Sequence, residues 1–256
     1  MRVIFNEELK AVADDLDRMA QDVRKAINGA GDALLNQNLE AAQAVIDGDI
    51  EIDALESSVI DQCVKLLAKQ NPVATDLRVV VSTLRLAATF ERMGDLARHI
   101  AEAARRTYPA SPLPADAQPL FAEMQAFLDN VADQVVSMLT DRDTKTAEEI
   151  ILNDDKLDAL HKKTFELAQS EDWKGTNQQL IDVVLTGRFM ERLGEQTPFP
   201  RPAAWCSSSP VSTRPRSRPA TKAPTSTEGS SPLLAFSLTR WVVSVWKPPI
   251  SLICGR

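Results

Sequence analysis

Apolar residues recur every three or four positions along most of this 256-residue chain, which restricts its main part to amphipathic helices. Nine glycines and a single tyrosine argue against a turn-rich all-β fold. Helices are predicted at about residues 9–27, 38–69, 72–106, 120–139 and 144–169, and from about residue 174, with Pro72 in the first turn of the third helix. The first helix has the clearest stripe, formed by Leu9, Val12, Leu16, Met19, Val23 and Ile27.

An internal duplication divides these helices into two similar sets. The motif Asp-x-x-x-Asp-Ala-Leu begins at Asp49 and again at Asp154. A second motif begins with Glu-Arg at Glu91 and again at Glu191, and each copy contains a glycine. A repeat of roughly 100 residues is too long for a solenoid unit and suits a three-helix bundle instead.

The duplication therefore predicts an all-α fold of two tandem up-down-up three-helix bundles, each with its own apolar seam. The first bundle is expected over residues 1–107 and the second over residues 115–196, with its last helix incomplete. The proline-containing segment from Tyr108 to Pro114 is expected to link them.

The amino-acid composition of the chain changes after Glu195. The last 61 residues contain 10 of the 15 prolines, 11 serines and three of the four tryptophans. Residues 197–256 are interpreted either as a disordered Pro/Ser-rich tail or as an out-of-frame product. The second interpretation is favoured, with a frameshift between Glu195 and Pro198, because the break interrupts a helical motif and acidic residues almost vanish.

The net charge of residues 1–195 restricts the partners that this part of the chain can bind. Residues 1–195 contain 21 basic and 35 acidic residues, a net charge of −14. Such a body is a poor nucleic-acid binder and favours cations or basic protein surfaces. The start of the chain has no signal-peptide pattern, and no apolar run is long enough for membrane insertion, so a cytoplasmic protein is expected. Cys63 is expected in the core.

Four acid-x-x-x-acid pairs are the candidate metal ligands. They are Asp49/Asp53, Glu91/Asp95, Asp154/Asp158 and Glu191/Glu195. Residues four apart share a helix face, and two such pairs on neighbouring helices would direct four carboxylates to one spot. Hard or borderline cations bind oxygen ligands of this kind. A solvated acidic face is the alternative. Gly94 and Gly194 favour close helix contact, because a glycine inside a helix is otherwise destabilising.

At these residues the chain resembles the PhoU family of bacterial phosphate-signalling accessory proteins. The similarity covers residues 1 to about 195 and also includes the start Met1-Arg2-Val3-Ile4-Phe5. Two longer segments carry most of it, Asn71-Pro72-Val73-Ala74-Thr75-Asp76-Leu77-Arg78 and Phe90-Glu91-Arg92-Met93-Gly94-Asp95-Leu96-Ala97.

The resemblance implies a non-enzymatic regulator. Proteins of this family hold down phosphate uptake and the phosphate-starvation response when phosphate is plentiful. It implies contacts with the ATPase of the phosphate ABC transporter and with a sensor histidine kinase, and a homodimer. It also implies a multinuclear iron, zinc or other divalent metal cluster at the four acidic pairs. Glu195 stands where the family usually has Asp.

Two other functions remain open. One is a carboxylate-bridged metalloenzyme, for which Asp158-x-x-His161 and Asp95-x-x-x-His99 have usable spacings. No second Asp/Glu-x-x-His occurs, and each histidine is expected at a helix surface. The other is a structural helical scaffold, which predicts neither metal nor partner.

Overall fold

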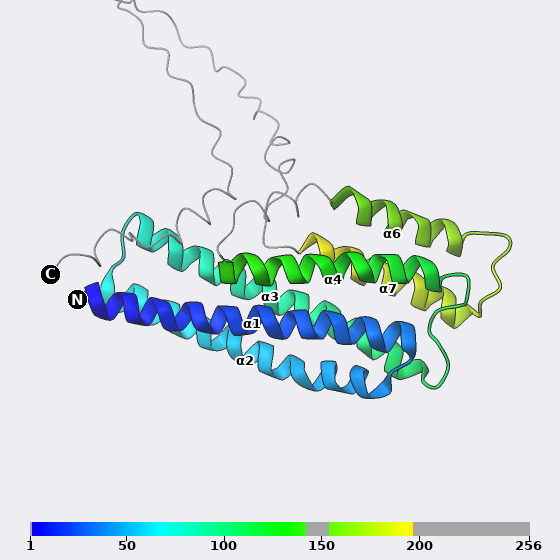
Figure 1. Ribbon diagram of the computed structural model, residues 1–256, viewed down its shortest axis with the longest axis horizontal. Coiled ribbons are helices and arrows are strands. Elements are labelled where there is room, and N and C mark those ends of the chain that lie inside the picture. The colour runs from blue at the N-terminus through cyan, green and yellow to red at the C-terminus, as the bar shows by residue number, and fades with distance from the viewer. Residues whose placement is uncertain (1, 142–153, 197–256) are drawn as a thin grey trace, which may run out of the picture.

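The computed structural model describes residues 2–141 and 154–196, and helices are the only regular secondary structure in this part of the chain (Figure 1). The first three helices are α1 (Arg2–Asn36), α2 (Leu39–Gln70) and α3 (Thr75–Thr107). They are followed by α4 (Gln118–Asp141), α6 (Asp154–Ala168) and α7 (Asn177–Glu195). The predicted all-α fold is confirmed. The expectations for residues 197–256 and for the start of the fifth predicted helix lie outside the described residues.

Local sequence signals set the helix ends. The Asn38 side chain accepts a hydrogen bond from the Ala41 amide at 3.1 Å and thereby caps α2. Asn71 ends this helix in the left-handed conformation, with φ of 44°. Helix α3 then begins at Thr75, so the prediction that Pro72 lies in its first turn is wrong. At α7, Thr176 and Gln179 form a capping box, which places the start at Asn177.

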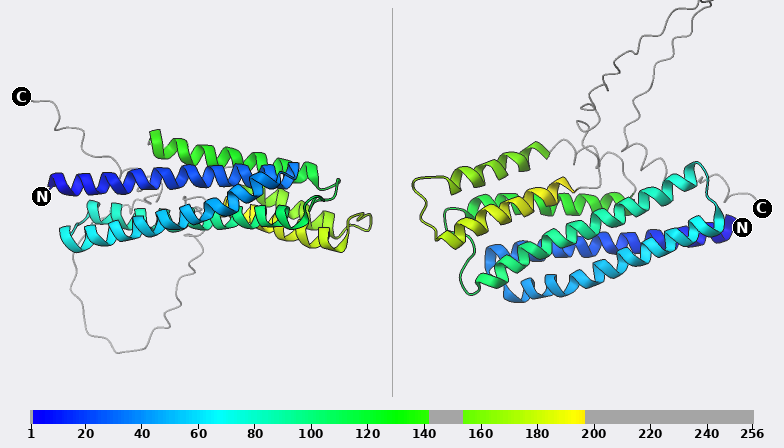
Figure 2. Two further views of the ribbon diagram at one scale, coloured as in Figure 1. Left: turned by 90° about the horizontal axis from the view of Figure 1, so that it is seen from below. Right: turned by 180° about the vertical axis from the view of Figure 1, so that it is seen from behind.

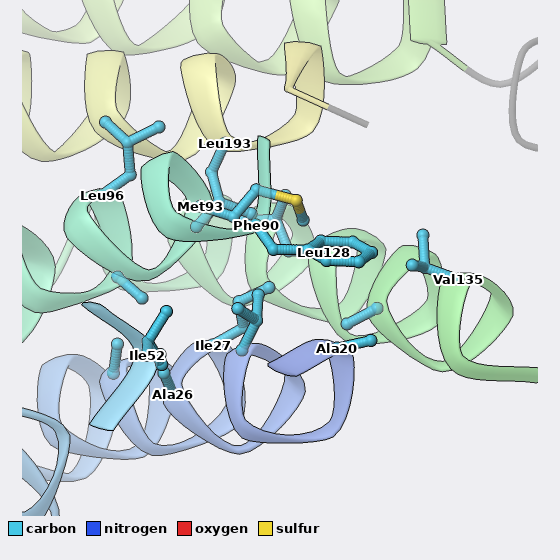
Figure 3. Close-up of a cluster of buried hydrophobic side chains, with 14 of the residues drawn as sticks. Ala20, Ala26, Ile27, Ile52, Phe90, Met93, Leu96, Leu128, Val135 and Leu193 are labelled. Atoms are coloured by element: carbon cyan, nitrogen blue, oxygen red, sulfur yellow. The ribbon is translucent and has the colours of Figure 1, made fainter. Parts of the chain in front are cut away.

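The two bundles pack side by side. Helix α4 lies against α1, and α7 lies against α3, while α6 covers α4 and α7 from outside (Figures 1 and 2). Buried side chains from both repeats form one continuous cluster, so the two expected seams merge into a single core. Figure 3 shows its centre, with Ile27, Ile52, Phe90, Leu128 and Leu193 contributed by five different helices.

The contact between α1 and α4 depends on one glycine. The Gln125 amide group donates a hydrogen bond to the Ile27 carbonyl at 3.1 Å and another to Asp129 at 2.7 Å. A Cβ atom on Gly31 would lie only 2.2 Å from the Gln125 Cδ atom. Glycine therefore lets a buried polar side chain of the second repeat reach α1 and donate a hydrogen bond to the Ile27 carbonyl there, while Asp129 accepts another on its own helix.

Two further predictions concern single features. Cys63 is buried as expected, and burial raises the pKa of its thiol to about 11. Among the helices of residues 2–141 and 154–196, none combines the length and apolar character required to cross a bilayer.

Candidate functional site

The first acidic cluster lies where α2 crosses α3. A Cβ atom on Gly94 would lie 3.0 Å from Ile52 Cδ1 and 3.5 Å from Asp49 Oδ1, so the two helices approach closely at this glycine. The approach brings the Asp49/Asp53 pair of α2 beside the Glu91/Asp95 pair of α3, and these carboxylates influence one another electrostatically. The structure thus gathers the two sequence motifs of the first repeat on one surface.

Arg98 is the cation that this cluster already contains. Its Nε atom lies 2.6 Å from Asp49 Oδ2, and its terminal nitrogens lie 2.7 Å from Asp95 Oδ1 and 2.8 Å from Glu102 Oε1. The Nε–H bond is not aligned with a hydrogen-bond acceptor, so the contact with Asp49 is an ion pair. One guanidinium therefore faces three carboxylates across two helices, and its hydrogen bond with Asp95 raises the pKa of Arg98.

The cluster holds more negative charge than Arg98 neutralises. Burial and the neighbouring charges of Asp95, Glu56 and Asp53 raise the pKa of Glu91 to about 7. Burial also raises the pKa of Asp49, although Arg98 acts in the opposite direction. The surface between α2 and α3 is therefore suited to attract a further cation or proton.

The second cluster repeats this plan between α6 and α7. A Cβ atom on Gly194 would lie 2.2 Å from Leu157 Cδ2, which shows the same close helix approach. Glu191 is buried, and its Oε2 atom accepts a hydrogen bond from Arg188 at 2.5 Å. Burial and the charge of Glu195 raise the pKa of Glu191. Asp158 adds to this effect, so three of the four predicted carboxylates meet here.

Asp154, the fourth predicted ligand, begins α6, and its side chain lies outside the described residues. The cluster also contains His161, whose side chain is only 12% exposed, so the expectation of a surface histidine is wrong for this residue. Its Nδ1 atom lies 4.0 Å from Glu191 Oε1, and its buried Nε2 atom has no hydrogen-bond partner. Burial and the charge of Arg188 lower the pKa of His161, which favours the neutral ring.

Sequence reasoning missed several members of these clusters. The arginines follow or precede an acidic residue by three positions, a spacing that predicts contact on a helix. Glu56 occupies the position of the first Asp-x-x-x-Asp motif that matches His161 in the second, seven residues after its first Asp. His161 is a candidate through its spacing from Asp158, and counting the same distance in the first copy would have found Glu56.

The donor atoms of the two clusters suit a divalent cation. Carboxylate oxygens predominate, and the Nε2 atom of His161 adds an unpaired nitrogen donor to the second cluster. In residues 2–141 and 154–196, however, no three His, Cys, Asp or Glu side chains are arranged to hold a metal ion. The chemistry fits a metal, whereas Asp49 and Asp95 are paired with Arg98, and Glu191 is paired with Arg188, in the conformation described.

Comparison with known proteins agrees with this duplicated architecture. The model of the PhoU domain matches residues 16–104 and 121–197, one stretch in each repeat. The chain is 33% identical over 195 residues to the phosphate-specific transport system accessory protein PhoU homolog 1 of Mycobacterium leprae, which covers 76% of this chain and 88% of the relative. The PhoU homolog 2 of Mycobacterium tuberculosis is also 33% identical, with 76% and 92% covered.

Solved structures show the same fold. The crystal structure of PhoU from Pseudomonas aeruginosa superimposes with a TM-score of 0.68 at 24% identity, over 75% of this chain and 92% of the other. The phosphate transport system regulatory protein PhoU from Streptococcus pneumoniae gives a TM-score of 0.66 at 22% identity, over 75% and 90%.

Proposed function

The chain belongs to the PhoU domain family, and from this premise we propose that it is an accessory regulator of phosphate transport. When phosphate is plentiful it holds down phosphate uptake and the phosphate-starvation response. It acts without catalysis, as a homodimer in the cytoplasm, by contacting the ATPase of the phosphate ABC transporter and the sensor histidine kinase.

The observation that carries this proposal is the match of the PhoU domain model to both repeats. Curated relatives that share a third of their residues with this chain are named as accessory proteins of the phosphate-specific transport system. The exposed, acid-rich helical surfaces of residues 2–141 and 154–196 offer contact faces of the kind that an interaction protein uses.

A complementation assay tests the proposal. The full chain is expressed in a bacterium that lacks its own PhoU-type protein and carries a reporter gene under a phosphate-starvation promoter. In phosphate-rich medium we expect reporter expression to fall, and the full chain to retain the transporter ATPase in a pull-down. Leu16→Asp, which places a charge in the core, is the matched negative control. A chain that accumulates in folded form while the reporter stays fully expressed would contradict the proposal.

The alternative of a carboxylate-bridged enzyme is not favoured. His161 lies beside the carboxylates of the second cluster, but the corresponding position of the first cluster is Glu56. The relatives are named as accessory proteins.

We also propose that the two clusters bind divalent metal, which would be iron, zinc or another borderline cation. Asp49, Asp53, Glu91 and Asp95 would hold it in the first repeat. Asp154, Asp158, Glu191 and Glu195 would do so in the second. Bound metal supplies positive charge that neutralises the carboxylates. The convergence of paired carboxylates at Gly94 and the unpaired Nε2 atom of His161 support this proposal.

Elemental analysis of the purified full chain tests metal binding. Asp49→Ala/Asp53→Ala and Glu91→Ala/Asp95→Ala should each lower the metal content per chain. Asp47→Ala/Glu51→Ala is the matched control, because this pair has the same spacing on α2 but lies exposed. Equal metal content in all variants would contradict the proposal.

A further inference from the structure

The two copies of the duplicated motif differ at the position of Arg98. An offset of 100 residues relates Glu91 to Glu191. It places Arg98 in register with Pro198, so the second copy has no arginine there. The arginine of the second cluster, Arg188, lies three residues before Glu191 on the same helix and pairs with it. Arg98 instead contacts carboxylates on both α2 and α3. The two clusters are therefore not equivalent, although their carboxylates have the same spacing.

The guanidinium group of Arg98 lies on two of the predicted metal ligands. Its Nε atom is 2.6 Å from Asp49 Oδ2 on α2, and one terminal nitrogen is 2.7 Å from Asp95 Oδ1 on α3. A second cation bound by Asp49 and Asp95 would meet this positive charge at close range, and like charges repel strongly where water is partly excluded. Arg98 and a metal ion would therefore compete for the same carboxylates.

Glu102 gives Arg98 a second place to bind. Its Oε1 atom accepts a hydrogen bond of 2.8 Å from the other terminal nitrogen of Arg98, and its Oε2 atom lies 3.3 Å from His99 Nδ1. Glu102 is four residues after Arg98 on α3, so this pair does not depend on how closely α2 approaches. It is also not among the predicted metal ligands. The guanidinium group can therefore leave Asp49 and Asp95 and remain paired.

We propose that Arg98 is an internal counter-ion that sets the metal affinity of the first cluster. In the metal-free chain it offsets the repulsion between the carboxylates of α2 and α3. It yields Asp49 and Asp95 to a divalent cation, which carries twice its charge, and then stays bound to Glu102. The inference rests on the metal binding proposed above and deepens it, because it assigns the affinity of one cluster to one residue.

Titration of the full chain with Zn²⁺, in competition with a chromophoric chelator, tests the inference. Every sample carries Asp158→Asn/Glu191→Gln/Glu195→Gln, which disables the second cluster, and this chain is called the background chain. Adding Arg98→Gln should raise the zinc affinity roughly tenfold or more, because the competing charge is removed. Arg98→Lys keeps one positive charge and should give a smaller gain.

Arg105→Gln is the matched control. Arg105 also joins α3 to α2, but through a hydrogen bond of 3.2 Å to the Gln43 side chain and not through a carboxylate. Its replacement removes the same charge and should leave the zinc affinity close to that of the background chain.

Thermal unfolding distinguishes a competing cation from a purely structural contact. With a chelator present, Arg98→Gln should lower the melting temperature, because the carboxylates of α2 and α3 lose the cation that they share. Zinc should raise the melting temperature of this variant by more than it raises that of the background chain. Loss of a structural contact would instead weaken zinc binding. Circular dichroism checks folding, and Arg98→Lys decides if Arg98→Gln does not fold.

Glu102→Gln tests the second place at which Arg98 binds. It should weaken zinc binding, because the displaced guanidinium group loses its remaining partner. In a chain that already carries Arg98→Gln, the same change should have little effect. An equal loss of affinity with and without Arg98 would contradict the part assigned to Glu102.

Two outcomes would overturn the inference. Zinc binding by Arg98→Gln that is equal to or weaker than that of the background chain would do so and leave the metal-binding proposal in place. Absence of zinc binding by both chains would remove the first cluster as a metal site, and the inference with it. Elemental analysis of the unchanged chain separates the two cases, because it reports whether the chain holds metal at all.

Discussion

One carboxyl group of the acidic clusters, that of Glu91, has a pKa near neutral pH. Glu91 lies among Asp53, Glu56 and Asp95, and burial together with these charges raises its pKa from 4.5 to about 7. A carboxyl group with a higher pKa in the folded chain binds more protons there than in the unfolded chain. The free energy of unfolding therefore decreases as the pH rises from about 4.5 to about 7.

Glu91→Gln should remove much of this pH dependence. Glutamine resembles the protonated carboxyl group, so the variant should match the unchanged chain near pH 4.5 and exceed its unfolding free energy at pH 8. We expect a gain of roughly 1–2 kcal/mol, reduced from the full shift because the side chain is partly accessible to solvent. Urea denaturation in the presence of a chelator measures it.

Asp61→Asn is the control for this experiment, because Asp61 is an exposed carboxyl group on α2. It should keep the pH profile of the unchanged chain. A profile for Glu91→Gln that is as steep as that of the unchanged chain would contradict the role assigned to this residue.

The acidic residues of the clusters could be predicted from the sequence, because identical spacing recurs in both copies. The ion pair of Arg98 with Asp49 could not, since the sequence does not show which of many basic residues turns toward another helix. His161 illustrates the same limit: its burial depends on how α6 packs on α7. Metal binding at the predicted ligands stays a prediction.

Helices were the most predictable elements, because a period of 3.6 residues persists over long stretches. Their ends depended on local details: Asn71 in the left-handed conformation delays the start of α3 past Pro72. The close contacts at Gly94 and Gly194 were also foreseeable, since an unexplained glycine inside a helix indicates close packing of a neighbouring helix, here through the side chains of Ile52 and Leu157. The contact between α1 and α4 was not, because nothing in the sequence pairs Gly31 with Gln125.

Gly31→Ala should destabilise the protein although alanine favours helices. Its Cβ atom would collide with Gln125, whose hydrogen bonds to Ile27 and Asp129 prevent it from moving aside. We expect a loss of about 1–3 kcal/mol in unfolding free energy. Gly48→Ala on α2 is the matched control, because no atom lies within 4 Å of its added Cβ, and it should gain up to about 1 kcal/mol. Thermal unfolding of both variants measures these changes in stability. A stabilised Gly31→Ala protein would contradict this interpretation of the contact.

The molecule as a whole should unfold as one unit, because the two repeats share a continuous core. Leu16 of α1 is fully buried, and Leu16→Ala should cost about 2–5 kcal/mol. The loss should appear as faster hydrogen exchange in α7 as well as in α1, measured by mass spectrometry of peptides from both helices. Unchanged exchange in α7 would show that the repeats unfold separately.

Helix α3 extends past the described end of α7, and this difference has a consequence for the rate at which a partner would associate. Among residues 2–141 and 154–196, α3 has exposed positions such as Val81, Arg85 and Arg92 in its N-terminal half, and a partner that binds there would move none of the described helices. Rigid-body encounters of this kind are limited by diffusion and orientation, not by internal rearrangement. The association rate should therefore depend steeply on ionic strength, and the lifetime of the complex should depend on the apolar contacts formed after arrival.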